Sequence, residues 1–357
     1  MGPLQGIRVV EMSGIGPAPF CAMVLADLGA DVIRIVRPNT PVDPRDVLSR
    51  SRPTIELDIS IPEGKAAVLD LVGKADILIE GFRPGVMEKN ALGPEDCLAV
   101  NPRLIYGRMT GWGQFGPLAH TAGHDINYIA ITGALHSIGR KDETPPPPIN
   151  FVGDFGGGGM LLLVGLLAAL HEAKVSGQGQ VIDAAMSDGT TLLSAFIHGL
   201  RAQGHWSSQR GANLLDGAAP FYDTYRCSDG RFIAIGAIES KFYQELRSRC
   251  GLGDSLYDDQ MNTHCWESQK QALAALIATR TREEWTHLLE GTDSCFAPVL
   301  DWDEAPEHPH NKAREAFLNL EGTLHPAPAP RFSRSPSAIP RSAYKGTLAD
   351  VKERWGL

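Results

Sequence analysis

Residues 7–36 read IRVVEMSGIGPAPFCAMVLADLGADVIRIV, and their pattern decides the expected fold. Ile7–Met12 is a short apolar run that ends at Ser13-Gly14, which predicts a strand. Ala18–Leu28 has the apolar spacing of a helix, and Asp31–Val36 predicts a second strand. A strand, a helix and a strand in this order are the unit from which parallel sheets are made.

This alternation continues for much of the chain. Further predicted strands are Ala75–Glu80, Leu104–Met109 and Gln180–Ala185, and further predicted helices are Lys65–Val72, Pro94–Val100, Gly156–Ala173 and Thr190–Ala202. From Phe221 the pattern changes to a hairpin-like pair (Phe221–Arg226 and Arg231–Ile238), followed by helices near Lys241–Cys250, Trp266–Ala278 and Arg282–Gly291. We therefore predict an α/β fold with a parallel sheet and a smaller α+β domain.

Composition excludes several classes of protein. The 357 residues suit two domains, and the net charge of −9 argues against a nucleic-acid or membrane-surface binder. Six scattered cysteines without a Cys-x-x-Cys pattern indicate reduced thiols. The longest apolar run, Met160–Leu170, is far shorter than the roughly 20 residues that span a bilayer. Because Met1–Gly6 also lacks a signal-peptide pattern, we expect a cytoplasmic protein that binds neither nucleic acid nor membrane.

The first turn, Ser13–Pro19, resembles a dinucleotide-binding loop without completing it. The third glycine of that fingerprint is replaced by Pro19, and Arg34 and Arg37 stand where an acid would hold a ribose. Together with other basic residues, this favours an anionic, nucleotide-like ligand and disfavours an NAD-linked dehydrogenase. The basic residues in question are Arg37, Arg50, Arg52, Arg83 and Lys89. Alternatively, the glycines only shape a turn and the arginines lie in solvent.

Two residues are candidates for proton transfer. His124 lies between Gly123 and Asp125 at a predicted helix start, and Asp154 precedes a run of glycines. An imidazole and a carboxyl on opposite faces of one carbon would remove and return a proton beside a carbonyl. The Asp125 amide, at the positive end of a helix, would hold the oxygen of the enolate. The structural alternatives are that His124 and Asp154 only cap their own helices.

Three further features bear on the function. Glu239 ends a predicted strand, where it would either orient His124 or be a solvated carboxylate. The glycines at 156–159 would allow close approach of a ligand, or serve helix–sheet packing. His308 and His310 lack further metal ligands at suitable spacing, so we expect no metal.

Six segments together resemble the α-methylacyl-CoA racemases of the class III CoA-transferase family, over Leu4 to about Pro340. They are LADLGADVI (25–33), GHDINY (123–128), NFVGDFGGG (150–158), NLLDGAAP (213–220), GAIE (236–239) and GTDSCFAP (291–298). The resemblance implies a Rossmann-like large domain over 1–186, a linker over 187–220 and a small α+β domain over 221–307. Residues 308–357 would return to the large domain. It also implies an interlocked homodimer whose active sites are shared between subunits.

The resemblance also implies roles for individual residues. His124 and Asp154 match the acid/base pair, Glu239 the carboxylate that reaches the histidine from the partner subunit, and the Asp125 amide the donor to the thioester oxygen. The candidates for binding coenzyme A (CoA) are Arg37, Leu57, Asp58, Ile59, Ser60, Arg83, Lys89, Gly123, Ile126, Asn127 and Tyr128. Asn150 and Tyr222 match residues that line the substrate pocket. Independently of the resemblance, Leu215, Ile238, Met186 and Leu214 are candidates for an apolar surface that holds the acyl chain, or they pack in the core.

The expected reaction interconverts (R)- and (S)-2-methylacyl-CoA by 1,1-proton transfer through an enolate, with no cofactor beyond the CoA of the substrate. His124 would take the α-hydrogen of the S form and Asp154 that of the R form. One alternative is a CoA transferase in which Asp154 is the nucleophile, and another is a catalytically silent acyl-CoA-binding protein. Ser60 stands where relatives often carry a lysine, and the chain ends Trp355-Gly356-Leu357 without a peroxisomal address.

Overall fold

In the computed structural model, residues 2–253 and 255–357 are described, and the chain forms two compact units. Unit 1 consists of the residues up to Leu135, Pro147–Ala195 and Glu315–Leu357. Unit 2 consists of His136–Pro146 and Phe196–Arg314. Unit 2 is therefore inserted into the chain of unit 1.

Unit 1 contains a parallel sheet of seven strands in the order β12-β3-β2-β1-β4-β5-β6. The strands are β1 (Arg8–Met12), β2 (Asp31–Val36), β3 (Pro53–Glu56), β4 (Ile77–Glu80), β5 (Ile105–Thr110), β6 (Gln180–Ala185) and β12 (Tyr344–Lys345). The strand order reverses between β1 and β4, as in a Rossmann fold, and such a point opens a crevice at the carboxyl ends of the strands. The predicted α/β fold with a parallel sheet is confirmed.

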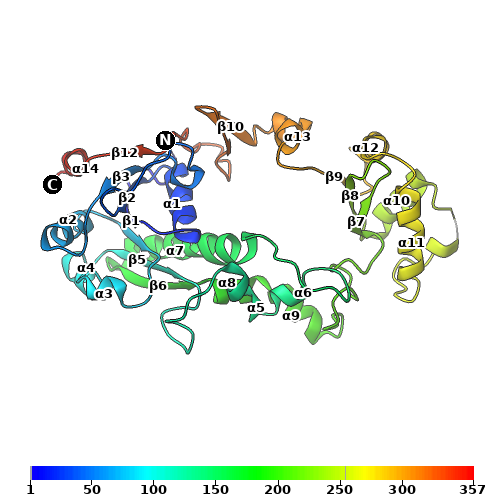
Figure 1. Ribbon diagram of the computed structural model, residues 1–357, viewed down its shortest axis with the longest axis horizontal. Helices are drawn as coiled ribbons and strands as arrows, with labels where there is room; N and C mark the ends of the chain where they lie inside the picture. The colour runs from blue at the N-terminus through cyan, green and yellow to red at the C-terminus, as the bar shows by residue number, and fades with distance from the viewer. Residues whose placement is uncertain (1, 254) are drawn as a thin grey trace. The chain divides into compact units, whose positions relative to one another are not determined.

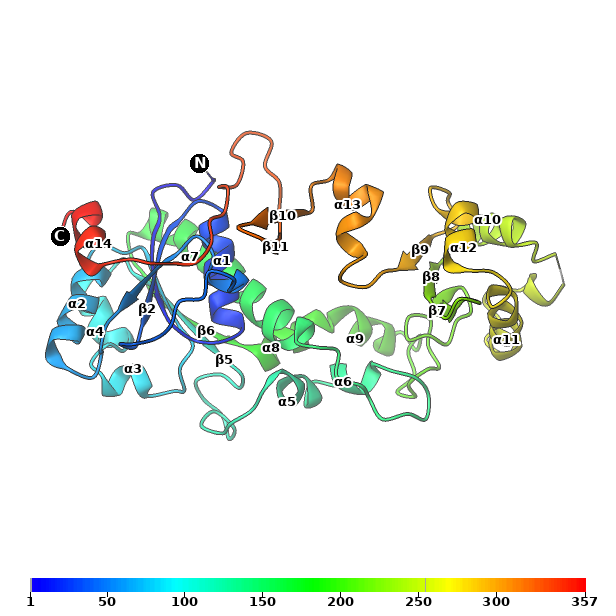
Figure 2. The same cartoon turned by 45° about the horizontal axis from the view of Figure 1, so that its top comes forward.

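Helices cover both faces of this sheet, as Figures 1 and 2 show. Because successive side chains of a strand point to opposite faces, Val9 and Val10 belong to different hydrophobic clusters. On one face, α1 (Pro17–Asp27) and α7 (Leu161–Ser176) pack on the side of Val9. On the other, α2 (Pro62–Val72), α4 (Pro94–Val100) and α14 (Leu348–Trp355) pack on the side of Val10.

Two arginines that the sequence suggested for anion binding are instead buried. Arg50 and Arg52 are 1% and 0% exposed. Arg50 pairs with Asp27 over 2.5 Å, and Arg52 pairs with Glu11 over 2.8 Å. The prediction was wrong for both residues, because a buried charge is retained only with a partner and these partners are acids of α1 and β1.

The glycine-rich segment forms a π-helix, η2 (Phe151–Met160), that continues into α7. The helix was predicted to begin at Gly156, but it begins at Phe151. Asp154 therefore lies inside the helix and does not cap it. A Cβ at Gly157 would lie 2.7 Å from the Thr190 nitrogen, and one at Gly159 would lie 2.7 Å from a Phe20 ring carbon. These glycines therefore serve close packing between helices.

The joined helix Phe151–Ser176 is long and apolar enough, by length and composition, to cross a membrane, with a mean hydropathy of 1.7. It is longer than the apolar run suggested, because η2 and α7 are continuous. In this structure Leu162, Leu163 and Leu166 pack in the cluster between α7 and the sheet. α7 therefore covers one face of the sheet as a core helix of unit 1.

Unit 2 has a three-stranded antiparallel sheet in the order β7-β8-β9. The strands are β7 (Tyr222–Arg226), β8 (Phe232–Gly236) and β9 (Phe296–Val299), and the larger helices are α10 (Ser240–Cys250), α11 (Trp266–Ile277) and α12 (Arg282–Leu289). Phe221, Ile233, Tyr243 and Trp285 form part of its core. The hairpin and the three helices were predicted, whereas β9 was not.

Shorter elements complete the chain. They are α3 (Val86–Lys89), α5 (Asp125–Ala130), α6 (Ala134–Ser137), α8 (Met186–Leu193), α9 (Ala195–Ala202), α13 (Pro309–Ala313), β10 (Phe317–Leu320) and β11 (Thr323–Pro326), with 3-10 turns at Val47–Ser49, Ser255–Tyr257 and Ala305–Glu307.

The units differ in four places from the predicted domain ranges. Residues 196–220, expected in the linker, and residues 308–314, expected in the return to the large domain, belong to unit 2. Residues 187–195, expected in the linker, belong to unit 1 as most of α8. Residues 136–146, expected in the large domain, belong to unit 2. The reason is the side-chain contacts of this loop: Arg140 binds Asp223 of β7, and Arg210 donates to the carbonyls of His136 and Arg140.

Candidate functional site

A cavity of about 520 Å³ opens in unit 1 at the carboxyl ends of β1 and β4. Its wall includes Ile15 and Gly16 after β1, Phe82 and Arg83 after β4, and Trp112 after β5. His124 and Asp154 both line it, together with Gly123, Tyr128, Asn150 and Met186. Two candidate proton-transfer residues, 30 positions apart in the sequence, therefore share one cavity at the reversal of strand order.

The first turn of α5 places His124. The His124 amide donates to Oδ1 of Asn127 over 3.0 Å, and its carbonyl accepts from the Asn127 and Tyr128 amides. The Tyr128 hydroxyl donates to the carbonyl of Gly123, and its ring meets Trp112 edge-on at 4.8 Å. A Cβ at Gly123 would lie 2.7 Å from the Tyr128 ring, so glycine is required beside the histidine.

Asp154 is held from two sides. Its backbone amide donates to Oδ2 of Asp125 over 2.7 Å, and its carboxylate accepts from Nδ2 of Asn150 over 3.1 Å. The turn after β1 approaches it closely, since a Cβ at Gly16 would lie 3.0 Å from Oδ2 of Asp154. Gly16 also has a φ of 70°, a conformation that glycine adopts without strain.

The cavity changes the acidity of Asp154. Burial is the largest cause and raises the pKa of its carboxyl, and the Asp125 charge acts in the same direction. The hydrogen bond from Asn150 and the charge of His124 lower this pKa and offset part of the rise. Asp154 therefore keeps its proton to a higher pH than an ordinary aspartate does, as a general acid requires.

A second cavity of unit 1, of about 550 Å³, shares Phe82 with the first. It is lined by Arg37 and the run Leu57–Ser60, which the resemblance assigned to CoA. The Asp58 carboxylate accepts from the Ser60 amide over 2.9 Å and from its hydroxyl over 2.6 Å, and these bonds lower the pKa of Asp58. The Ser60 hydroxyl is therefore engaged in this turn.

Three of the CoA candidates lie outside both cavities. Lys89 is exposed on α3, and Ile126 and Asn127 are exposed on α5. Asn127 serves the backbone of His124, as described above.

The substrate-pocket candidates are divided between the units. Asn150 and Met186 line the cavity of His124, whereas Leu215 and Tyr222 line a cavity of about 590 Å³ in unit 2. Leu214 and Ile238 pack against the core of unit 2. Glu239 is exposed at the N-cap of α10 in unit 2.

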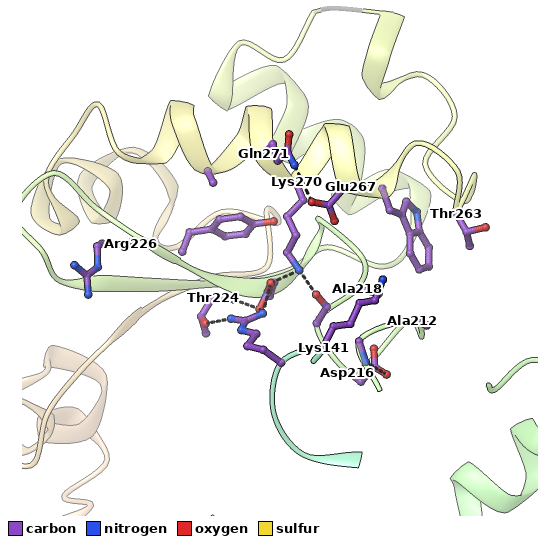
Figure 3. A pocket seen from close by; sticks show the side chains of 17 residues that line it. Lys141, Ala212, Asp216, Ala218, Thr224, Arg226, Thr263, Glu267, Lys270 and Gln271 are labelled. Carbon is purple, nitrogen blue, oxygen red and sulfur yellow. Dashed lines mark hydrogen bonds and ion pairs between the residues drawn. The ribbon is translucent and has the colours of Figure 1, made fainter. Parts of the chain in front are cut away.

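Unit 2 has a larger cavity, of about 700 Å³, which the sequence did not indicate (Figure 3). Lys270 and Glu267 of α11 lie on one side of it, and Lys141 and Asp216 on the other. The ammonium of Lys270 and the guanidinium of Arg140 share the carboxylate of Asp223, over 2.5 and 2.7 Å. These ion pairs join the 136–146 loop to β7 and α11.

Two residues that line the cavity of His124 and Asp154 were not predicted from the sequence. Phe82 and Trp112 received no role, although both follow strands at their carboxyl ends. That position is the available signal, because ligands bind there in parallel sheets. Within the part of the chain that the structure describes, no cluster of three His, Cys, Asp or Glu residues is arranged to hold a metal ion.

The chain is similar to known proteins over most of its length. The family described as CoA-transferase family III matches residues 4–346. The chain is 45% identical to the α-methylacyl-CoA racemase of Mus musculus and 46% identical to that of Homo sapiens, in each case over 94% of this chain and 88% of the relative. The crystal structure of a CAIB/BAIF family protein from Brucella suis superposes with a TM-score of 0.84, at 26% identity over 99% of both chains.

Proposed function

The chain belongs to CoA-transferase family III, and from this we propose that it is a racemase that interconverts (R)- and (S)-2-methylacyl-CoA thioesters. The relationship to two racemases at 45–46% identity supports this activity. The structural observation that carries it is the shared cavity of His124 and Asp154. A histidine and an aspartate with a raised pKa at one cavity suit an exchange in which one residue takes a proton and the other returns it.

In the proposed reaction, one residue removes the α-proton and the C–H electron pair moves onto the thioester oxygen to form an enolate. The other residue then gives a proton to the opposite face of the same carbon. His124 serves the S form and Asp154 the R form, and the roles exchange in the reverse direction. The Asp125 amide holds the enolate oxygen, because a backbone donor at a helix start stabilises developing negative charge.

CoA would extend from this cavity into the neighbouring one. The two share Phe82, and Arg37 of the second offers a cation for the anionic groups of CoA. Binding energy from these distant groups positions the α-carbon for reaction. Since the thioester itself delocalises the carbanion, the proposed reaction needs no cofactor beyond the CoA of the substrate.

We further propose a homodimer in which Glu239 of one subunit reaches His124 of the other. Unit 1 exposes several large apolar side chains, as an interface requires. They are Ile131 (64%), Val164 (56%), Leu192 (60%) and Leu193 (58%). Mixing an inactive His124→Ala protein with an inactive Glu239→Ala protein tests this arrangement. A shared site would give heterodimers with one intact site and so restore activity, whereas a site within one subunit would restore none.

The activity is tested by incubating one epimer of a 2-methylacyl-CoA in deuterated water. We expect deuterium at C2 together with loss of optical purity, measured by mass spectrometry and chiral chromatography. A thioester that binds while showing neither exchange nor epimerisation would overturn the proposal. That result would leave a protein that binds acyl-CoA without acting on it.

The family membership keeps a CoA transferase as the second candidate. In that reaction the Asp154 carboxylate attacks the thioester carbonyl and forms an acyl anhydride, releasing CoA as the thiolate. A free carboxylic acid supplied with an acyl-CoA donor would then acquire CoA, and hydroxylamine would trap the acyl-enzyme. The racemase predicts neither result.

A further inference from the structure

The Asp125 side chain carries a feature that folding alone does not explain. It is 8% exposed, and its Oδ2 accepts the hydrogen bond from the Asp154 amide. Its other oxygen, Oδ1, is buried and has no hydrogen-bond partner among the residues that the structure describes. A buried carboxylate oxygen without a partner destabilises the folded state, so such a group calls for another role.

The chain is shaped to admit this carboxylate beside η2. A Cβ at Gly153 would lie 2.5 Å from Oδ2 of Asp125 and 3.0 Å from a methyl carbon of Ile129. Atoms do not approach this closely without displacement, so a Cβ at position 153 would force the Asp125 carboxylate away from the start of η2. The Asp125–Asp154 contact therefore depends on Gly153 as well.

We propose that the Asp125 carboxylate is a positioning residue for the two proton-transfer groups. It fixes Asp154 at the cavity through the backbone amide, and its negative charge favours the protonated state of the Asp154 carboxyl. This role rests on the proposed racemase function. It is separate from that of the Asp125 amide at the thioester oxygen.

Residues from several elements around the cavity affect the pKa of Asp154. His124 and Asp125 carry the charges that act on its carboxyl, and Asn150 donates to it. Burial raises the pKa of Tyr128 of α5 most, the charge of Asp154 raises it less, and the charge of Arg83, in the turn after β4, lowers it. The turn before α1 approaches with the uncharged Gly16. Of the two charges, only that of Asp125 favours the protonated carboxyl.

The same helical turn also sets the place of the histidine. His124 is the N-cap of α5 and Asp125 is its first residue. Because Asp125 binds the Asp154 amide directly, the first turn of α5 links the positions of the imidazole and the carboxyl. A displacement of the carboxylate would change the separation of these two groups, and misplacement by about 1 Å costs roughly 100-fold in rate.

Two variants separate the effect of the Asp125 charge from the effect of the Asp125 position. Asp125→Asn retains an oxygen that accepts from the Asp154 amide but removes the charge. Gly153→Ala retains the charge but forces the carboxylate away. Asp188→Asn, an identical substitution at an exposed site on α8, is the matched control. Steady-state kinetics, the pH profile of deuterium incorporation, and a carbon-13 NMR titration of Asp154 in substrate-free protein are the readouts.

We expect Asp125→Asn to move the Asp154 titration, and with it the pH profile, to lower pH, because a like charge is lost. Gly153→Ala should reduce kcat by roughly 100-fold with little change in KM, and Asp188→Asn should behave as the unsubstituted protein. An unchanged titration in folded Asp125→Asn, or a normal kcat in Gly153→Ala, would overturn the positioning role. If the unsubstituted protein catalyses no exchange, the proposed function fails, while the substrate-free titration still decides the role of Asp125.

Discussion

The side-chain amide of Asn150 donates a hydrogen bond to the carboxylate of Asp154 over 3.1 Å, so the residue before the π-helix stabilises the ionised form of the acid/base group within it. This bond opposes the rise in the Asp154 pKa that burial causes. The acidity of Asp154 is thus set by competing contacts, and each can be removed separately.

Asn150→Ala should move the pH dependence of exchange to higher pH. Loss of the donor raises the pKa of Asp154 further, so a higher pH is needed before Asp154 takes the proton of the R epimer. In the reaction of the S epimer, Asp154 must carry the proton that it donates. The fall of this rate at high pH should therefore also move to higher pH. Deuterium incorporation from each epimer across a pH series measures both effects, and opposite movements would contradict the assignment of Asp154.

His124→Ala should reduce kcat by about 10²- to 10⁴-fold, the usual contribution of a general acid or base. The fold should persist, because the contacts of this residue with Asn127 and Tyr128 use its backbone. His120→Ala, at an exposed position in the preceding loop, is the matched control. Full turnover by the His124 variant, with the control also active, would remove His124 from the mechanism.

Arg37→Ala should raise the KM for the CoA thioester about ten-fold with little change in kcat, since a hydrogen bond to a charged group contributes about 1.5–3 kcal/mol. Arg37 lines the neighbouring cavity and not the one that holds the reacting groups. Arg45→Ala removes an exposed arginine of the same loop that is paired with Asp43, and should change neither constant. Equal KM values for the two variants would exclude Arg37 from CoA binding.

Glu11→Ala should destabilise unit 1 by about 3–5 kcal/mol, because it leaves the buried Arg52 charge without its carboxylate. A double variant, Glu11→Leu with Arg52→Leu, removes both charges and should recover much of this loss. The free energy of unfolding in urea measures both effects. Equal destabilisation by the single and double variants would show that packing, and not charge, dominates at this site.

The strands of the sheet were predictable where short apolar runs are bounded by turn residues. Asp31–Val36 and Gln180–Ala185 were predicted with the bounds that the structure shows. The edge strand β12 has only two residues, and β3 begins with a proline, so neither has a clear local pattern. Both form because the sheet offers a free edge, which is a property of the assembled fold.

The site was less accessible to local reasoning. The two helix starts made His124 and Asp154 candidates for proton transfer, and the resemblance to a family supported the pair, but spacing alone could not show that they line one cavity. The burial of Arg50 and Arg52 could not be seen either, because their acidic partners lie 23 and 41 positions away. The π-helix depends on contacts of its glycines with α1 and α8, which no local preference encodes.

The return of the chain to unit 1 has a consequence for its synthesis. β12 pairs with β3 at the edge of the sheet, and Trp355 of α14 is buried against the face that carries Val10. Unit 1 therefore cannot close while residues 344–355 remain inside the ribosome. Unit 2 is complete by Arg314 and can assemble first. The nascent polypeptide must therefore keep an unfinished sheet from pairing with neighbouring chains until residues 344–355 have left the ribosome.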